Sequence, residues 1–463
     1  MGIGTIYLVG AGPGASDLMT VRGLRLLRQA DLVICDALLP HRLLEELGIS
    51  TRNKSVMQLQ AGETRHGQRQ VLELMRRAAS DGKTVVRLKG GDPLVFGRAS
   101  EELEFFCQHG IPWEIVPGPS VSTAALSSAG LPITWRKQGR SFAVVTARLA
   151  GGELNRSLPR VETLVVFMGV AVLEGVVQQM LQDGWKPDTA AALLERVTMP
   201  WERRLRGPLC RMPAIARAAG VSAPAILVAG AAALRREAFR LRPTILFTGL
   251  DPTNFRRLGA VLHWPALIVV RDEAGVQAVP QAVSKLQNRQ FELVIFTSRA
   301  GVRSFFRALN EQGLDARLLA GARIVAAGSG TDAELLQQGL RADAVAQQPG
   351  SAGILRAIGP SAGGQTLLVQ GSHAPQDLEH EMRKRGLRVL RLALHKVLTH
   401  PELGKALPEH DVIYFTSPSG VRAYWKLYGS AAFKTEVWCI GEATLKEVER
   451  LGYSGKVVNP NVS

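Results

Sequence analysis

A loop of glycines and proline follows the first apolar run of the chain. Residues 5–9 read TIYLV, and Gly10-Ala-Gly-Pro-Gly14 comes directly after them. Because glycine carries no Cβ, such a loop lets a ligand approach the backbone closely. Its GxGxG spacing with an internal proline differs from the GxGxxG that opens a dinucleotide-binding helix, so no nicotinamide dinucleotide site is expected. A plain turn is the equal alternative for this loop taken alone.

Three further motifs in the first half carry residue types suited to ligand binding. Asp36 ends an apolar run, Arg87 to Arg98 reads RLKGGDPLVFGR, and Val116 to Ser120 reads VPGPS. Together with the first loop they form a far more specific set than any one of them. For Asp36 and Asp92 the alternative is a structural one, in which the carboxylate caps a turn or a helix.

The second half contains an internal repeat whose polar residues could hold anions. Phe291 to Phe306 reads FELVIFTSRAGVRSFF and His410 to Trp425 reads HDVIYFTSPSGVRAYW. The stretches that follow also match, since Ala322 to Gly339 and Glu436 to Gly452 each predict a strand, a glycine, a threonine and a helix. Two similar α/β lobes facing each other fit this pattern. Their loops and helix N-termini would offer N–H groups and hydroxyls to carboxylates.

Other reaction classes lack their motifs. Gly328 to Thr331 has no GK[ST] ending, no HExxH occurs among the nine histidines, and Ser417 to Gly420 is no GxSxG elbow. The four cysteines are far apart without a CxxC pair, which argues against a zinc ribbon or a disulfide framework. They are expected to be buried structural thiols, and no metal site is expected.

These motifs need elements that position them, and the apolar pattern predicts an α/β fold. Short runs rich in Val, Ile and Leu alternate with amphipathic stretches of helical period. The expected strands are Thr5–Val9, Asp31–Cys35, Thr84–Leu88, Ile115–Val116, Phe142–Thr146, Leu164–Met168 and Ala190–Leu194, and the expected helices lie near Thr20–Gln29, Gln68–Asp81 and Ala99–His109. The basic segment Leu234 to Pro243 is the candidate linker. It predicts two domains, residues 1–240 and 241–463.

Charge points to a polyanionic partner. Lys and Arg number 56 against 40 Asp and Glu, a formal net charge of +16. Aromatic residues are only 6% and no run interleaves them with basic residues, so nucleic acid is not expected as a partner. A small molecule that bears several carboxylates or phosphates fits better. The longest apolar stretches are too short to cross a bilayer, and the N-terminus lacks the basic region of a signal peptide, so we expect a cytoplasmic protein without membrane contact.

The order GAGPG, strand-end Asp, RLKGGDPxxFGR, VPG and VFMG resembles the tetrapyrrole methyltransferase family, most closely its uroporphyrinogen-III C-methyltransferases. The resemblance covers about residues 3 to 235. It implies a two-lobed domain that binds S-adenosylmethionine (SAM) in a cleft and methylates two pyrrole carbons of uroporphyrinogen III to give precorrin-2. That substrate carries eight carboxylates, in agreement with the charge. By resemblance the methyl donor would be surrounded by Pro13, Gly90, Gly91, Asp92, Val95, Ser120, Val121 and Met168.

The resemblance also assigns a catalytic role and shows departures. Asp36 matches an aspartate that accepts the proton lost when a pyrrole is methylated. Where the family has a lysine thought to donate a proton, the chain reads Gln58-Leu59-Gln60 before Ala61-Gly62, and Lys54 lies on the opposite strand face. The family's usual threonine and alanines are replaced by Pro119-Ser120-Val121. A usual glycine is replaced by Val197. A side chain at such a position could block the donor.

Residues 244 to about 460 resemble the uroporphyrinogen-III synthase family through FTSRAGV, AAGSGT, LLVQGS, FTSPSGV and IGEAT. This implies a second two-lobed α/β domain that closes hydroxymethylbilane to uroporphyrinogen III, mainly by shaping and orienting the substrate between its lobes. The carboxylates would be held by Thr297, Ser298, Thr331, Gly371, Ser417, Ser419 and Thr444. His395 stands where the family usually has a tyrosine that helps the hydroxyl leave, and the alternative is a structural histidine.

Three functions therefore stay open at this point. The first is a bifunctional enzyme on the siroheme or cobalamin branch, active in both domains, with the methyltransferase domain as a homodimer contact. The second keeps the synthase but makes the methyltransferase domain a degenerate binding module, as Leu59 and Val197 would suggest. The third is RNA methylation, which fits the charge but not the second domain.

Overall fold

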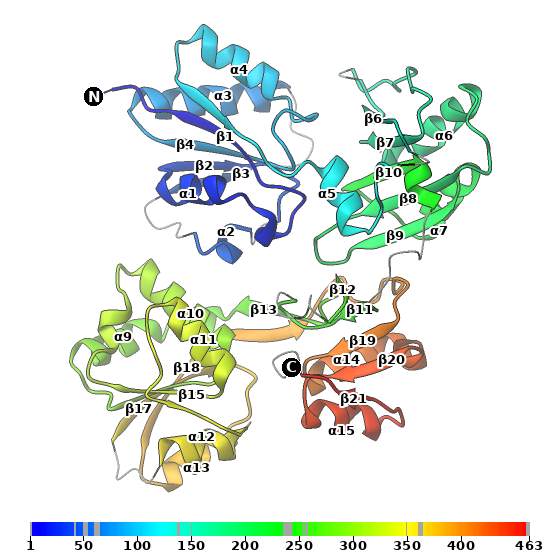
Figure 1. Cartoon of the computed structure of the whole chain (residues 1–463). Coiled ribbons are helices and arrows are strands. Elements are labelled where there is room, and N and C mark those ends of the chain that lie inside the picture. Colours follow the sequence, from blue (N-terminus) through cyan, green and yellow to red (C-terminus); the bar gives the residue numbers. More distant parts are fainter. Residues whose placement is uncertain are drawn as a thin grey trace. The chain divides into compact units, whose positions relative to one another are not determined.

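Four sheets carry the fold, three of five strands and one of six. The computed structural model (Figure 1) describes residues 2–40, 43–49, 54–59, 65–136, 139–149, 151–234, 243–252, 255, 258–348, 350–359 and 364–459. The chain divides into two units, residues 1–265 together with 404–463, and residues 266–403. The predicted boundary at residue 240 falls in 235–242, outside the described residues, and stays a prediction.

The first sheet is entirely parallel, with the order β3-β2-β4-β1-β5. Its elements are β1 Ile6–Gly10, β2 Leu32–Cys35, β3 Ser55–Gln58, β4 Val85–Lys89 and β5 Trp113–Val116, with helices α1 Val21–Gln29, α2 Leu43–Glu46, α3 Arg65–Ser80 and α4 Ala99–Gln108. Helices α3 and α4 bury Met75 and Phe106 on one face, and α1 and α2 bury Leu27 and Leu43 on the other. Burial on both faces explains why the central strands are almost wholly apolar.

The second sheet is mixed, with the order β6-β7-β10-β8-β9, and only β6 and β7 are parallel. It consists of β6 Phe142–Thr146, β7 Thr163–Phe167, β8 Ala190–Glu195, β9 Arg203–Pro208 and β10 Ala225–Gly230, with helices α5 Val121–Ser128, α6 Leu173–Gln182 and α7 Met212–Ala218. Met180 of α6 and Met212 of α7 pack on one face, whereas Leu126 of α5 packs on the other. The first half therefore has the two sheets expected of a two-lobed domain.

The third sheet joins segments from both ends of the second half, in the parallel order β12-β11-β19-β20-β21. Its elements are β11 Thr244–Phe247, β12 Ala260–His263, β19 Val412–Phe415, β20 Glu436–Cys439 and β21 Lys456–Val457, with helices α14 Pro418–Tyr428 and α15 Glu442–Arg450. The buried rings of Phe247 and Tyr414 lie 5.9 Å apart between centroids on neighbouring strands. They tie the two segments together in one core.

The fourth sheet forms the unit of residues 266–403, in the order β13-β18-β17-β14-β15-β16. Its strands are β13 Leu267–Arg271, β14 Leu293–Phe296, β15 Arg323–Ala326, β16 Ala344–Val345, β17 Gln365–Gly371 and β18 Arg388–Thr399. Its helices are α8 Glu273–Val276, α9 Val279–Gln287, α10 Arg299–Glu311, α11 Ser329–Gln337, α12 Ser351–Ile358 and α13 Asp377–Lys384. Phe305 of α10 is buried on one face of the sheet and Met382 of α13 on the other. Only β13 is antiparallel to its neighbour.

The internal repeat is confirmed as two copies of one strand–helix–strand–helix arrangement. β14, α10, β15 and α11 form the first copy, and β19, α14, β20 and α15 form the second. Even the ion pair between the two helices recurs, since Arg303 contacts Glu334 at 2.8 Å and Arg422 contacts Glu447 at 3.1 Å. The Val-Arg pair seen at one offset in both motifs therefore has the same structural task in each copy.

Two expectations need correction. The cysteines are free, but only Cys35 and Cys439 are buried, whereas Cys107 and Cys210 are exposed because they lie on outer faces of a helix and a turn. The pattern also missed β3 and β9, since Ser55–Gln58 and Arg203–Pro208 are edge strands with exposed or charged residues. The central buried strand β10 and helices α2, α5, α6 and α7 were not predicted either. No helix within the described ranges is both long and apolar enough to span a membrane.

Candidate functional sites

Three glycine loops converge at the carboxyl end of the first sheet. Gly12 and Gly91 exchange backbone hydrogen bonds of 3.2 Å and 2.8 Å, which joins the loop after β1 to the loop after β4. A Cβ on Gly10 would lie 2.5 Å from the nitrogen of Gly118 in the loop after β5. Only glycine permits this approach, so the GAGPG, GGDP and VPG motifs form one structure at the edge where open α/β sheets bind ligands.

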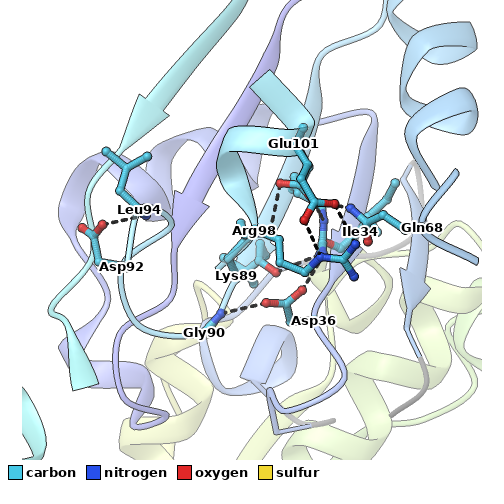
Figure 2. A network of polar contacts seen from close by, with 12 residues as sticks. Ile34, Asp36, Gln68, Lys89, Gly90, Asp92, Leu94, Arg98 and Glu101 are labelled. Atoms are coloured by element: carbon cyan, nitrogen blue, oxygen red, sulfur yellow. Dashed lines mark hydrogen bonds and ion pairs between the residues drawn. The ribbon is translucent and has the colours of Figure 1, made fainter. Parts of the chain in front are cut away.

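Asp92 links two of these loops. Its Oδ1 accepts a hydrogen bond from the backbone N–H of Leu94 at 2.9 Å, and its Oδ2 accepts one from Gly118 at 3.2 Å. Figure 2 shows the contact with Leu94. Both carboxylate oxygens therefore have structural partners, which is the turn-capping role that the sequence left open. Asp92 also remains at the loop junction where a donor ligand was predicted.

Asp36 presents an oriented carboxylate at the end of β2. Its Oδ1 accepts from Nη2 of Arg87. Its Oδ2 accepts from the backbone N–H of Gly90 at 3.2 Å, as Figure 2 shows. Both donors come from β4 and the loop that follows it, not from the turn of Asp36 itself. The Asp36 side chain is 28% exposed, whereas that of Arg87 is 3% exposed. The carboxylate is thus held from inside the protein and reachable from outside.

A buried network of charged residues lies behind Asp36. Glu102 of α4 accepts from Nε of Arg87 at 3.2 Å and from Nζ of Lys89 at 2.9 Å, and Gln68 of α3 donates to it at 3.2 Å. Arg87, Lys89 and Glu102 are all buried. Burial lowers the pKa of Lys89, and the charge of Glu102 opposes that shift. Sequence reasoning missed this network, although Arg87 and Lys89 alternate within an apolar strand and so share one face.

The other predicted donor-binding residues flank the glycine loops. Pro13 is buried, and Ser120 caps α5 by accepting a hydrogen bond from Ser122. Val121 would lie 3.2 Å from a Cβ on Gly91, so it packs against the GGDP loop. Val95 is half-buried, and Met168 after β7 is half-exposed with φ of +56°. The exposed thioether of Met168 is therefore presented by an unusual backbone conformation.

The structure places the departures from the family pattern. Nζ of Lys54 donates to the carbonyls of Arg28 and Ala30 at the end of α1, at 2.7 Å and 2.6 Å, so it serves as a helix cap. Leu59 packs against the core under α3 and α4, and Val197 is buried in the core under α5. Gln60, Ala61 and Gly62 lie outside the described residues. The expected clash of Val197 with a donor is not supported, because its side chain points into the core.

A segment that the sequence analysis passed over also reaches the first glycine loop. Oγ1 of Thr198 accepts from the N–H of Ala15 at 3.1 Å, and the N–H of Thr198 donates to Oε2 of Glu202 at 2.8 Å. A Cβ on Gly14 would meet the side chain of Met199. The loop after β8 therefore buttresses GAGPG from the second sheet, and no local pattern in the sequence signals this.

In the second half, two serines cap the repeated helices in the same way. Oγ of Ser298 accepts from the N–H of Gly301 at 3.0 Å, and Oγ of Ser417 accepts from that of Gly420 at 3.1 Å. Ser419 lies 3.2 Å from Ser417 between hydroxyl oxygens. All these residues follow the carboxyl ends of parallel strands, where helix N-termini favour anions.

The remaining predicted residues divide between the two units. Thr297 donates through its hydroxyl to the carbonyl of Val369 at 3.2 Å, and Thr331 is buried in the first turn of α11. Gly371 ends β17, where the register of the strand shifts. These three residues and Ser298 belong to residues 266–403, whereas Ser417, Ser419 and the buried Thr444 belong to the other unit.

His395 is buried in β18, opposite both Gly371 and Arg271 in the strand register. Its Nδ1 has no hydrogen-bond partner in the described part of the chain. Burial lowers the pKa of His395, so the imidazole is neutral at pH 7 and would donate only through an N–H. Among the residues that the structure describes, no group of three or more His, Cys, Asp or Glu side chains could hold a metal ion.

Two family models match the chain in succession. The model described as Tetrapyrrole (Corrin/Porphyrin) Methylases matches residues 5–213, and that described as Uroporphyrinogen-III synthase HemD matches residues 253–463. A porphyrin biosynthesis protein HemD of Ruminiclostridium josui is 30% identical over 469 residues, which covers 91% of this chain and 88% of that protein.

Other relatives match one half. A siroheme synthase of Thiobacillus denitrificans is 35% identical over 242 residues, covering 50% of each protein, so the chain spans about half the length of such relatives. The uroporphyrin-III C-methyltransferase of Thermus thermophilus, solved in complex with S-adenosyl homocysteine, is 36% identical with a TM-score of 0.42 and covers 49% of this chain and 92% of its own.

Proposed function

The chain belongs to the family of the porphyrin biosynthesis protein HemD, with a tetrapyrrole methylase region before a uroporphyrinogen-III synthase region, and from that premise we propose that it makes uroporphyrinogen III and methylates it. The synthase region would close hydroxymethylbilane. The methylase region would then transfer two methyl groups from SAM to give precorrin-2, on the siroheme or cobalamin branch. The observation that carries this proposal is the carboxylate of Asp36 beside three joined glycine loops, in a chain whose other half matches the synthase model.

The residues around Asp36 suit a SAM site. Among the described residues, a Cβ on Gly90 would meet only Leu39, at 3.9 Å, which leaves space beside this part of the GGDP backbone for a bound group. SAM, when bound, supplies an electrophilic methyl group on a cationic sulfur. The proposed donor-binding set is Pro13, Gly90, Gly91, Asp92, Val95, Ser120, Val121 and Met168. In it, the glycines permit close approach, and Met168 offers a polarisable thioether to the sulfonium.

Asp36 would accept the proton that the tetrapyrrole loses after methylation. An accepting carboxylate must lie within reach of the carbon and keep a fixed orientation. Arg87 and Gly90 hold its two oxygens, and the remaining lone pairs face the exposed side of the residue. The methylated carbon is fully substituted and has no hydrogen, so the proton would leave the adjoining methylene bridge for a carboxylate oxygen of Asp36, and the electron pair of the broken C–H bond would neutralise the positive charge that methylation leaves on the pyrrole.

In the synthase region, hydroxyls and helix N-termini would hold the substrate's carboxylates. The proposed set is Thr297, Ser298, Thr331 and Gly371 in one unit and Ser417, Ser419 and Thr444 in the other. Ser298 and Ser417 accept helix N–H groups, so the hydroxyl hydrogen of Ser298, and one from the hydrogen-bonded pair of Ser417 and Ser419, would donate to an anion. His395 would assist departure of the substrate hydroxyl through its neutral imidazole N–H.

One incubation tests the whole proposal. The purified chain receives freshly made hydroxymethylbilane and SAM, and the oxidised products are separated by isomer and mass. Dimethylated isomer III is the expected product. Isomer III without methyl groups would contradict the methyltransferase assignment, and isomer I alone would contradict the synthase assignment.

We also propose that the protein works in the cytoplasm as a homodimer joined through the methyltransferase region. The resemblance to tetrapyrrole methyltransferases is the support for both statements. Light scattering coupled to size-exclusion chromatography should give twice the mass of one chain, and a monomer at all concentrations would contradict the dimer. Fractionation of cells that produce the protein tests its location.

A further inference from the structure

The guanidinium of Arg87 connects the exposed carboxylate of Asp36 to the buried interior. Nη2 donates to Asp36, Nε donates to Glu102 at 3.2 Å, and Nη1 donates to the carbonyl of Ile34 at 3.3 Å. The planar guanidinium therefore has partners on all its nitrogens, from β2 and from α4. A group held on three sides in a packed interior has little freedom to change its orientation.

Glu102 anchors this guanidinium in turn. The carboxylate of Glu102 is fully buried and accepts hydrogen bonds from Arg87, Lys89 and Gln68. Two carboxylates, Asp36 and Glu102, thus face two cations, Arg87 and Lys89, so the four formal charges cancel. A buried charge is tolerated only when it is paired in this way, and removal of one member leaves another uncompensated.

We propose that Arg87 and Glu102 are positioning residues for Asp36 in the methyl transfer reaction. Arg87 fixes the carboxylate so that its free lone pairs face the substrate side, and Glu102 fixes Arg87. This inference rests on the proposed function, because it needs Asp36 to accept a proton. It adds to that function two residues that touch neither substrate nor donor.

Asp36 lies at the exposed end of this network, with its side chain 28% exposed, whereas Arg87, Lys89 and Glu102 are buried.

A double-mutant cycle tests the inference. The full-length chain is prepared with Arg87→Lys, with Asp36→Asn and with both changes, and methylation of uroporphyrinogen III is followed under single-turnover and steady-state conditions. Lysine keeps the positive charge but lacks the planar fork that spans Asp36 and Glu102. Arg217→Lys is the matched control. Arg217 of α7 forms an exposed ion pair with Glu174 of α6 at 3.1 Å, away from the glycine loops.

We expect Arg87→Lys to lower kcat by about 10- to 100-fold while the KM for uroporphyrinogen III and for SAM changes by less than about 3-fold, as for a misplaced reacting group. In the Asp36→Asn background the same change should have no further effect, because Arg87 acts through Asp36. A purely structural role would instead lower the rate by a similar factor in both backgrounds, and that result would overturn the inference.

Two further results keep the test decisive. If Arg87→Lys does not fold, the same cycle is run with Glu102→Gln, which keeps the shape of the anchor and weakens its hold on Arg87. If whichever of these two variants folds has the wild-type kcat, the inference is overturned but the proposed function is not. An unmodified chain that binds but does not methylate uroporphyrinogen III would overturn the proposed function, and the inference with it.

Discussion

At the scale of single residues, the carboxylate proposed to accept the proton has an orientation that is set by its surroundings. Asp36 could cap its own turn, as its position in the sequence allows. It instead accepts hydrogen bonds from Arg87 of the neighbouring strand β4 and from Gly90 of the loop after it. Asp92 shows the opposite outcome, since both its oxygens accept hydrogen bonds from backbone N–H groups of the glycine loops. Two aspartates with the same local alternatives therefore have different roles, and only their partners distinguish them.

Asp36→Asn should abolish most of the methylation. The amide cannot accept a proton from carbon, so we expect kcat to fall by about 100-fold or more, within the range for a lost general base. Binding of SAM, measured by calorimetry, should stay within about 3-fold of wild type. Asp81→Asn, at an exposed position after α3, is the control. Methylation at the wild-type rate in Asp36→Asn would exclude Asp36 as the proton acceptor.

His395 should make the synthase half sensitive to acid. Its pKa is lowered in the folded state by burial from the ordinary value of 6.5, so the unfolded chain binds the proton first as the pH falls. The stability that neutral His395 contributes is therefore complete above pH 6.5 and is lost as the pH falls towards the folded pKa. We expect the urea midpoint to drop between pH 7.5 and pH 5, and to drop less in His395→Gln.

His410 contributes in the same direction, because burial lowers its pKa as well. The same experiment on His410→Gln separates the two histidines, and the double variant should show the smallest acid effect. If His395→Gln loses as much stability as the wild type over this pH range, His395 is not the buried neutral group that the structure shows. Cyclisation by His395→Gln, scored as isomer III against isomer I, tests its catalytic role separately.

At the scale of elements, the two repeated helices depend on their serine caps. Ser298 is the N-cap of α10 and Ser417 is the N-cap of α14. Each accepts a hydrogen bond from the backbone N–H three residues later. Ser298→Ala and Ser417→Ala should each destabilise the protein by about 1 kcal/mol, the usual cost of losing such a cap. Chemical denaturation measures it. Ser284→Ala, on the exposed face of α9, should cost nothing, because alanine is the better helix former.

The same variants should also weaken the synthase reaction, because a hydroxyl proposed to bind a carboxylate is lost. We expect a rise in KM for hydroxymethylbilane and more isomer I among the products, which forms when the substrate is released unclosed. Equal product ratios in wild type, Ser298→Ala and Ser417→Ala would limit the serines to capping.

At the scale of the whole molecule, strand pairing determines which pieces of the chain can exist alone. Strands β1 to β10 pair only with one another in the described residues, whereas β11 and β12 need β19 to β21 from the other end of the chain. We therefore expect a fragment of residues 1–234 to fold and to methylate uroporphyrinogen III. A chain that ends at residue 403 should lose the β11 sheet, because β11 would be left with β12 as its only partner.

Fluorescence and circular dichroism distinguish these outcomes. In the full chain the rings of Trp201 and Trp264 lie 4.7 Å apart, so the 1–234 fragment loses one buried contact of Trp201. We expect a red-shifted tryptophan emission with native secondary structure. An unfolded 1–234 fragment would mean that the first half needs the second for stability.

Local patterns in the sequence were enough to predict much of the fold. Most buried strands of the first half and helices α1, α3 and α4 follow from apolar periodicity, since burial on one or two faces selects residue types at fixed spacing. The buried strand β10 is the exception, because it was not predicted. The repeat in the second half is visible because both copies have the same caps and turns. The edge strands β3 and β9 could not be predicted this way, because one or both of their faces meet solvent.

The glycine motifs, the strand-end Asp36 and the capping serines were readable from the sequence because each depends on backbone conformation over a few residues. Arg87, Glu102, Lys89 and Gln68 were not, since they come from separate elements and their roles exist only where α3, α4 and β4 meet. Burial makes them pair with one another, because a charge removed from water must find its partner in the protein. Which distant charges pair is therefore decided by packing in three dimensions, after the local patterns have formed the elements that carry them.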